Sequence, residues 1–231
     1  MGAFSSALFC GQKRNMSQVK FYPPLEEKLN ISSHALGLLL SLVGVPLLLF
    51  SESAQASWIS WTGKLIFGIS LVTLYTASTI YHMATDVKRR QRLRVLDHAA
   101  IYVLIAGTYT PIMLVTLGGS LVYETLGYGI LIAAWSMAIV GIILKLFYTG
   151  RFSLVSTLLY VFMGWAIVFA IKPLAASMSP AGLQWLIWGG ISYTVGAILY
   201  AIKAIPFNHA IFHLFVLLGS ACHFVCIYKY V

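Results

Sequence analysis

Charged side chains are scarce in this chain: Asp, Glu, Lys and Arg together make up 9% of its 231 residues. Soluble domains carry about 25% charged residues, so this composition excludes an ordinary water-soluble protein. Hydrophobic residues account for 60% of the chain, and the mean hydropathy is +0.88. The composition therefore predicts a protein that is integral to a membrane.

Cysteine is also rare, and the N-terminus shows no pattern of a cleavable signal peptide. Cys10, Cys222 and Cys226 form no CxxC pair and lack zinc-ribbon spacing, so we expect small packing residues rather than metal ligands. The formal net charge is +9, but the basic residues lie in short segments beside apolar stretches. That placement predicts membrane orientation and argues against nucleic acid as a partner.

Seven apolar stretches are separated by short polar breaks. A helix needs about 20 mostly apolar residues to cross about 30 Å of hydrocarbon, and each stretch meets that need. We therefore predict an all-α, seven-transmembrane helix bundle, in which short loops make sequential helices antiparallel neighbours. The predicted spans are residues 31–50, 59–83, 95–117, 123–147, 153–172, 183–203 and 208–229.

The distribution of basic residues predicts the orientation of this bundle. Twelve Lys and Arg residues lie in the N-terminal segment and the second, fourth and sixth connections, against three on the other side. The N-terminus is therefore expected in the cytoplasm and the C-terminus outside. Residues 1–30 form the predicted cytoplasmic segment, and residues 31–231 form the membrane domain. Met16 opens a more natural start, so residues 1–15 are expected to be an upstream extension.

Histidines gather at the predicted cytoplasmic end of the bundle. Five of the six lie there: His34, His82, His98, His209 and His213. Unpaired polar groups are costly in hydrocarbon, so ionisable residues within spans are functional candidates. His209 and His213 are four residues apart, which places both imidazoles on one helical face. This layer of imidazoles predicts a metal site.

The predicted metal is zinc, with His82, His209 and His213 as its ligands. Neutral imidazole is the commonest protein metal ligand, and three histidines with one open position are typical of catalytic zinc. Asp97 is the expected group to hold the water on the metal or to act as general base. Ser78 lies one turn before His82 and is expected to bond that water or a reacting carbonyl.

Simpler interpretations remain open for several of these residues. Asp97 could pair with Arg94, three residues earlier, and His98 and His223 could be hydrogen-bonded packing residues. The basic run 88–94, taken as a loop, could serve as an orientation signal or bind lipid headgroups. A further set shares one face of the first helix and either braces the site or serves the helix start: Glu27, Asn30 and His34.

Several of these residues also carry a family resemblance. The chain resembles the hemolysin III branch of the progestin and adipoQ receptor superfamily, which includes the adiponectin receptors. Order and spacing match from about residue 17 to the C-terminus. The matching segments are Glu27-x2-Asn30-x3-His34, Ser78-x3-His82, Leu96-Asp97-His98, Gly107-Thr108-Tyr109-Thr110-Pro111 and His209-x3-His213-x9-His223-Phe224.

The resemblance implies seven transmembrane helices in a bacterial inner membrane and intramembrane zinc near the cytoplasmic face. By motif, it places the zinc ligands on His82, His209 and His213, the water-holding acid on Asp97 and the serine on Ser78. Receptor members of the superfamily are associated with ceramidase-like amide hydrolysis, which implies a membrane lipid amide or ester as substrate. The alternatives are a non-enzymatic membrane protein with structural zinc and a cytolytic hemolysin.

Overall fold

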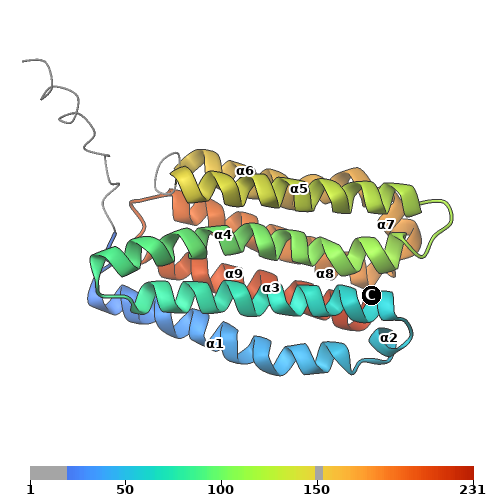
Figure 1. Ribbon diagram of the computed structural model, residues 1–231, viewed down its shortest axis with the longest axis horizontal. Coiled ribbons are helices and arrows are strands. Elements are labelled where there is room, and N and C mark those ends of the chain that lie inside the picture. Colours follow the sequence, from blue (N-terminus) through green and yellow to red (C-terminus); the bar gives the residue numbers. More distant parts are fainter. Residues whose placement is uncertain (1–19, 149–152) are drawn as a thin grey trace, which may run out of the picture.

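The computed structural model describes residues 20–148 and 153–231, and in these two ranges all regular structure is helical. The helices of these two ranges form seven rods. The rods run roughly along one axis (Figure 1). The first three are α1 (Pro24–Leu49), α3 (Trp58–Met83) and α4 (Val87–Pro111), and the short α2 (Glu52–Gln55) lies between α1 and α3. The other four rods are α5 (Glu124–Tyr148), α6 (Ser153–Trp165) with its continuation, α8 (Pro180–Ala201) and α9 (Asn208–Tyr230).

Two of the rods change helical type along their length. After Pro111, which has no N–H to donate, α4 continues as the π-helical segment η1 (Ile112–Leu117). The fifth rod is α6 followed by the 3₁₀ segment η2 (Ala166–Ala170) and α7 (Ile171–Ser177). Each predicted span corresponds to one rod, so the prediction of an all-helical bundle is confirmed for the described residues.

Six of the rods are long and apolar enough to cross a membrane. The remaining rod, α8, has 22 residues and is not among these six. Large apolar side chains point outward from the bundle; Leu39 and Val43 of α1 are 62% and 64% exposed. Outward apolar faces of this kind suit a surface covered by lipid rather than water.

Local sequence determines where the helices begin. Asp86 caps α4 by accepting a hydrogen bond from the Arg89 backbone N–H at 2.7 Å, and Ser57 and Ser179 cap α3 and α8 in the same way. The basic run 88–94 therefore forms the first turns of α4, and its interpretation as a loop was wrong. The predicted start of the first span was also late, because α1 begins at Pro24 with two glutamates in its first turn.

The rods close into a ring. Helix α3 packs between α1 and α4, α5 packs on α4, α8 packs on α9, and α9 returns to lie against α1. Consequently the last turn of α3 and the first turns of α1, α4 and α9 meet at one end of the bundle (Figure 1). We call this the histidine end. The predicted upstream extension 1–15 and the break at 149–151 lie outside the described residues.

Close packing of α3 on α4 gives a test of this arrangement. A Cβ atom added at Gly107 of α4 would lie 2.6 Å from Cβ of Ser70 on α3, so Gly107→Ala must separate the two helices. We expect a lower Tm in detergent, with a loss of about 1–3 kcal/mol from overpacking. The matched control is Gly129→Ala on α5, where no atom lies within 4 Å of the new methyl group. An equal loss in both variants would contradict the α3–α4 packing.

Candidate metal centre

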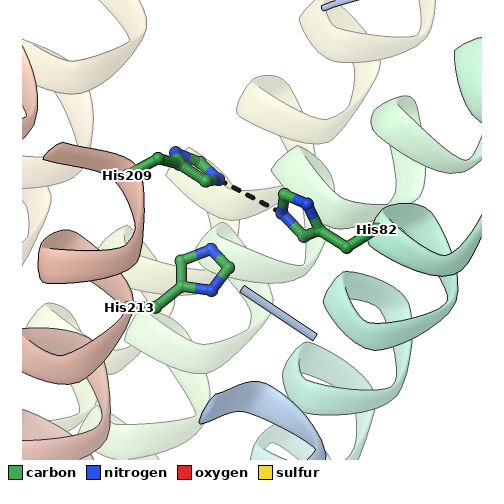
Figure 2. Close-up of side chains that lie close together, drawn as sticks. All are labelled: His82, His209 and His213. Atoms are coloured by element: carbon green, nitrogen blue, oxygen red, sulfur yellow. Dashed lines mark hydrogen bonds between the residues drawn. The ribbon is translucent and has the colours of Figure 1, made fainter. Parts of the chain in front are cut away.

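Three buried histidines meet at the histidine end of the bundle. His82 occupies the last turn of α3, and His209 and His213 occupy the first two turns of α9. One ring nitrogen from each lies within 4.8 Å of the others. Nε2 of His209 is 3.1 Å from Nε2 of His82 (Figure 2). Ligand nitrogens in a tetrahedral zinc site lie about 3.3 Å apart, so this spacing is close to what zinc requires.

Hydrogen bonds from the Nδ1 atoms of two of these rings orient them to bind a cation through Nε2. His82 donates from Nδ1 to Oε1 of Glu27 at 3.3 Å, and His213 donates from Nδ1 to the Asn30 carbonyl oxygen at 3.3 Å. A neutral imidazole with its proton on Nδ1 presents a lone pair on Nε2, and metal-binding histidines are oriented in this way. A proton or a cation must then lie between the facing Nε2 atoms of His82 and His209, so the residues fit a metal ion.

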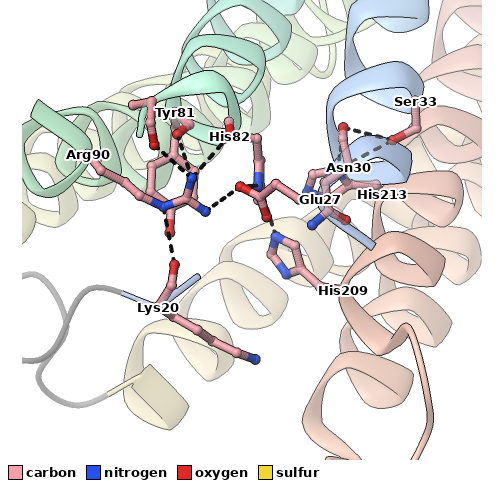
Figure 3. Close-up of polar contacts among 10 residues, drawn as sticks. Lys20, Glu27, Asn30, Ser33, Tyr81, His82, Arg90, His209 and His213 are labelled. Atoms are coloured by element: carbon pink, nitrogen blue, oxygen red, sulfur yellow. Dashed lines mark hydrogen bonds and ion pairs between the residues drawn. The ribbon is translucent and has the colours of Figure 1, made fainter. Parts of the chain in front are cut away.

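The carboxylate that orients His82 is itself held by a buried arginine. Arg90 is 1% exposed, and its Nη2 donates to Oε1 of Glu27 (Figure 3). Its Nη1 donates to the carbonyl oxygens of Tyr81, His82 and Ala84 at 3.4, 3.1 and 3.0 Å. These carbonyls lie at the C-terminal end of α3, where, among the described residues, only that of Tyr81 accepts a backbone N–H, from Ala84 at 3.2 Å. Arg90 therefore satisfies the helix end that carries His82.

Aromatic rings cover two of the three histidines. The Tyr22 ring stacks on His209 with centroids 4.5 Å apart and an interplanar angle of 17°. His34 stacks on His213 at 3.6 Å and 10°. Burial raises the pKa of the Tyr22 phenol, and the neighbouring Tyr200 adds to the rise. Tyr22 therefore stays protonated at neutral pH, as a hydroxyl group rather than a charged metal ligand.

The two predicted reactive groups lie close to this cluster without joining it. The Asp97 carboxylate is 3.5 Å from Nδ1 of His98, which donates to the Arg94 carbonyl oxygen at 2.8 Å. Among the described residues, no hydrogen bond joins Asp97 to the three histidines. Its charge does act on Tyr22, the ring that covers His209.

Ser78 lies one turn before His82 and is 1% exposed. Its hydroxyl has no hydrogen-bond partner among the described residues. A buried hydroxyl without a partner is costly, and it suits a group that bonds a water or a ligand. The roles assigned to Asp97 and Ser78 stay predictions.

Other histidines and cysteines take the positions that packing predicts. His223 bonds the Leu186 carbonyl oxygen through Nε2 at 3.2 Å and lies outside the cluster. Cys222 and Cys226 are buried free thiols in α9, whereas Cys10 lies outside the described residues.

Comparison with known proteins identifies the family. A family model described as "Haemolysin-III related" matches residues 23–224. The chain belongs to the hemolysin III family. It is 47% identical over 208 residues to "Hemolysin-3 homolog" of Bacillus subtilis (strain 168), which covers 89% of this chain and 94% of the relative.

Two further relatives of this hemolysin III family chain extend the comparison. "Hemolysin-3" of Bacillus cereus is 43% identical over 206 residues, covering 89% of this chain and 92% of the relative. The human "Monocyte to macrophage differentiation factor" is 30% identical over 213 residues, with coverage of 89% and 84%. The human relative fits the placement in the wider receptor superfamily, so the resemblance found in the sequence is confirmed.

Sequence reasoning missed two contributors to the site. Arg90 lies in a basic run whose members are otherwise mostly exposed, and the run alone does not distinguish the buried arginine. Arg90 and Arg94 share one helical face and are both buried, but only the structure reveals their burial. Tyr22 precedes the first helix, and only the structure places its ring on His209.

The Arg90–Glu27–His82 chain gives a test of metal affinity. Arg90→Gln and Glu27→Gln are each expected to weaken zinc binding about 10- to 100-fold, as loss of a group that orients a metal-binding histidine usually does. Competition with a chromogenic chelator on purified protein measures this. The control is Arg89→Gln, since Arg89 is exposed and contributes only its backbone N–H to the Asp86 cap. Unchanged zinc affinity in both test variants would contradict the role of the hydrogen bonds that join Arg90, Glu27 and His82.

Proposed function

We propose that His82, His209 and His213 bind zinc and that the protein hydrolyses an amide or ester of a membrane lipid. The observation that carries the proposal is the orientation of two of these rings: Glu27 and the Asn30 carbonyl accept from Nδ1 of His82 and His213, which leaves Nε2 of each ring free to bind a cation. Zinc, when bound, supplies Lewis acidity toward a carbonyl oxygen and toward water. The family and the relatives' printed names leave the reaction open.

The surrounding side chains supply the rest of the proposed chemistry. Asp97 acts as general base, because its charge reaches Tyr22, the ring that covers His209, whereas Glu26 and Glu27 are engaged with His209 and His82. Ser78 donates its free hydroxyl to the reacting carbonyl. Tyr22 and His34 exclude water from His209 and His213 by stacking on their rings.

A second function rests on a different observation. The histidines join α3 to α9, helices that are distant in the sequence, so zinc could serve as a structural clamp in a non-enzymatic membrane protein. The two functions differ in what Asp97 does, because a clamp does not need a base.

Substitution of the histidines and of Asp97 separates these functions. His213→Ala is expected to lose most of the bound zinc, measured by elemental analysis of purified protein, whereas His223→Gln keeps it. Asp97→Asn is expected to keep zinc and to lose turnover of a native lipid extract by about 10²- to 10⁴-fold, as removal of a general base does. Release of fatty acid measures turnover. Equal rates for Asp97→Asn and the parent protein, or no lipid consumed by either, would favour the clamp.

We also propose that the histidine end faces the cytoplasm, in the inner membrane of a bacterial cell. The excess of basic residues at that end supports this orientation. Alkaline phosphatase is active only outside the cytoplasm, so fusions after Gly119 and Val231 are expected to be active and a fusion after Asp86 inactive. The reversed pattern would place the site on the outer side.

A further inference from the structure

Two lysines lie on the tyrosine rings that surround His209. Nζ of Lys20 is 4.2 Å from the ring centroid of Tyr22, and Nζ of Lys203 is 3.8 Å from that of Tyr200. Both rings pack on His209, at centroid distances of 4.5 and 5.3 Å. Figure 3 shows the Lys20 side chain extending from the N-terminal arm toward the His209 side of the site. Two ammonium groups therefore flank one ligand of the proposed metal centre.

The two lysines come from opposite ends of the sequence, yet they lie close enough to repel each other. Partial burial and the charge of Lys20 lower the pKa of Lys203. No ion pair with a carboxylate relieves this repulsion among the residues that the structure describes. The nearby acids are engaged elsewhere: Glu26 accepts the His209 backbone N–H at 3.3 Å, and Asp97 lies beside His98. The two ammonium groups are therefore not paired with a carboxylate of the described residues, although the charges of Glu26 and Asp97 reach Tyr22.

An orientation signal alone does not account for this arrangement. The positive-inside rule requires only that basic residues lie on one side, as the exposed Lys28 and Lys88 do. Lys20 and Lys203 are exposed as well, but Lys203 lies on the Tyr200 ring and also donates to the Tyr200 carbonyl oxygen at 2.7 Å. Ordering two long side chains around one site costs conformational entropy and adds repulsion, which a bound anion offsets.

We infer that Lys20 and Lys203 form a binding site for the phosphate group of an acidic amphiphile, beside the Tyr22 and Tyr200 rings that pack on His209. The tyrosine rings place that phosphate beside His209, so the rest of the molecule lies next to the metal-binding histidines. The inference rests on the proposed function only where it identifies this amphiphile as the substrate. Phosphate binding by the two lysines stands without any reaction.

The test uses full-length protein in a neutral detergent, with dioctanoyl phosphatidate as the probe and the rise in Tm as the measure of binding. Dioctanoyl phosphatidylcholine, which has no net charge, is the comparison lipid, and inorganic phosphate is the third arm. We expect phosphatidate to bind more tightly than phosphatidylcholine. Lys20→Gln and Lys203→Gln are each expected to weaken phosphatidate binding about fivefold, and the double variant by more than tenfold. Competition by inorganic phosphate would show that the phosphate group itself is recognised.

The matched control is the Lys88→Gln/Arg89→Gln double variant, which removes the same charge from exposed positions in the first turn of α4. It is expected to bind phosphatidate like the parent protein. Equal weakening in both double variants, or none in the lysine pair, would overturn the site. Zinc affinity, measured on the same samples, confirms that the variants are folded. Lysine-dependent binding to zinc-loaded protein that releases no fatty acid from the bound phosphatidate would support the phosphate site while counting against the proposed function.

Discussion

One carboxylate oxygen determines the geometry of the histidine end. Oε1 of Glu27 accepts from both Arg90 and Nδ1 of His82, so a single acceptor joins α1, α3 and α4. Arg90 and His82 are both buried, and breaking a buried pair by removing one partner typically costs about 3–5 kcal/mol. The relative positions of three helices and the direction of the His82 lone pair therefore depend on the same contact.

The neighbouring glutamate extends this arrangement to the last helix. Glu26 accepts the backbone N–H of His209, at an α9 N-terminus whose own cap residue, Phe207, offers no side-chain hydrogen bond. A carboxylate at a helix N-terminus is stabilised by the helix dipole. Consecutive residues of α1 thus contact the two helices that carry the histidines. The first turn of α1 sets the separation of His82 and His209, although it contributes no side chain to the triad.

Much of this could be predicted because lipid restricts the alternatives. Uninterrupted apolar stretches predicted seven rods, and the one-sided placement of histidines predicted that His82, His209 and His213 would meet. What the sequence could not reveal depends on contacts between helices. Nothing in a basic run distinguishes Arg90, whose guanidinium ends α3, from the exposed Arg89 beside it. The partner of Asp97 was also open. Successive helical residues differ by about 100° in direction, and the sequence alone does not show which helix each of them faces.

The long sequence separation of the histidines has a consequence for how the protein is made. His82 is followed by four further rods before His209 appears in α9. Synthesis is vectorial, so α1, α3 and α4 can assemble around Glu27 and Arg90 while the C-terminal third of the chain is still in the ribosome. During that interval His82 has neither His209 nor His213 beside it. The three imidazoles can therefore come together only after α9 has been added, and a chain truncated before α9 retains only one of them.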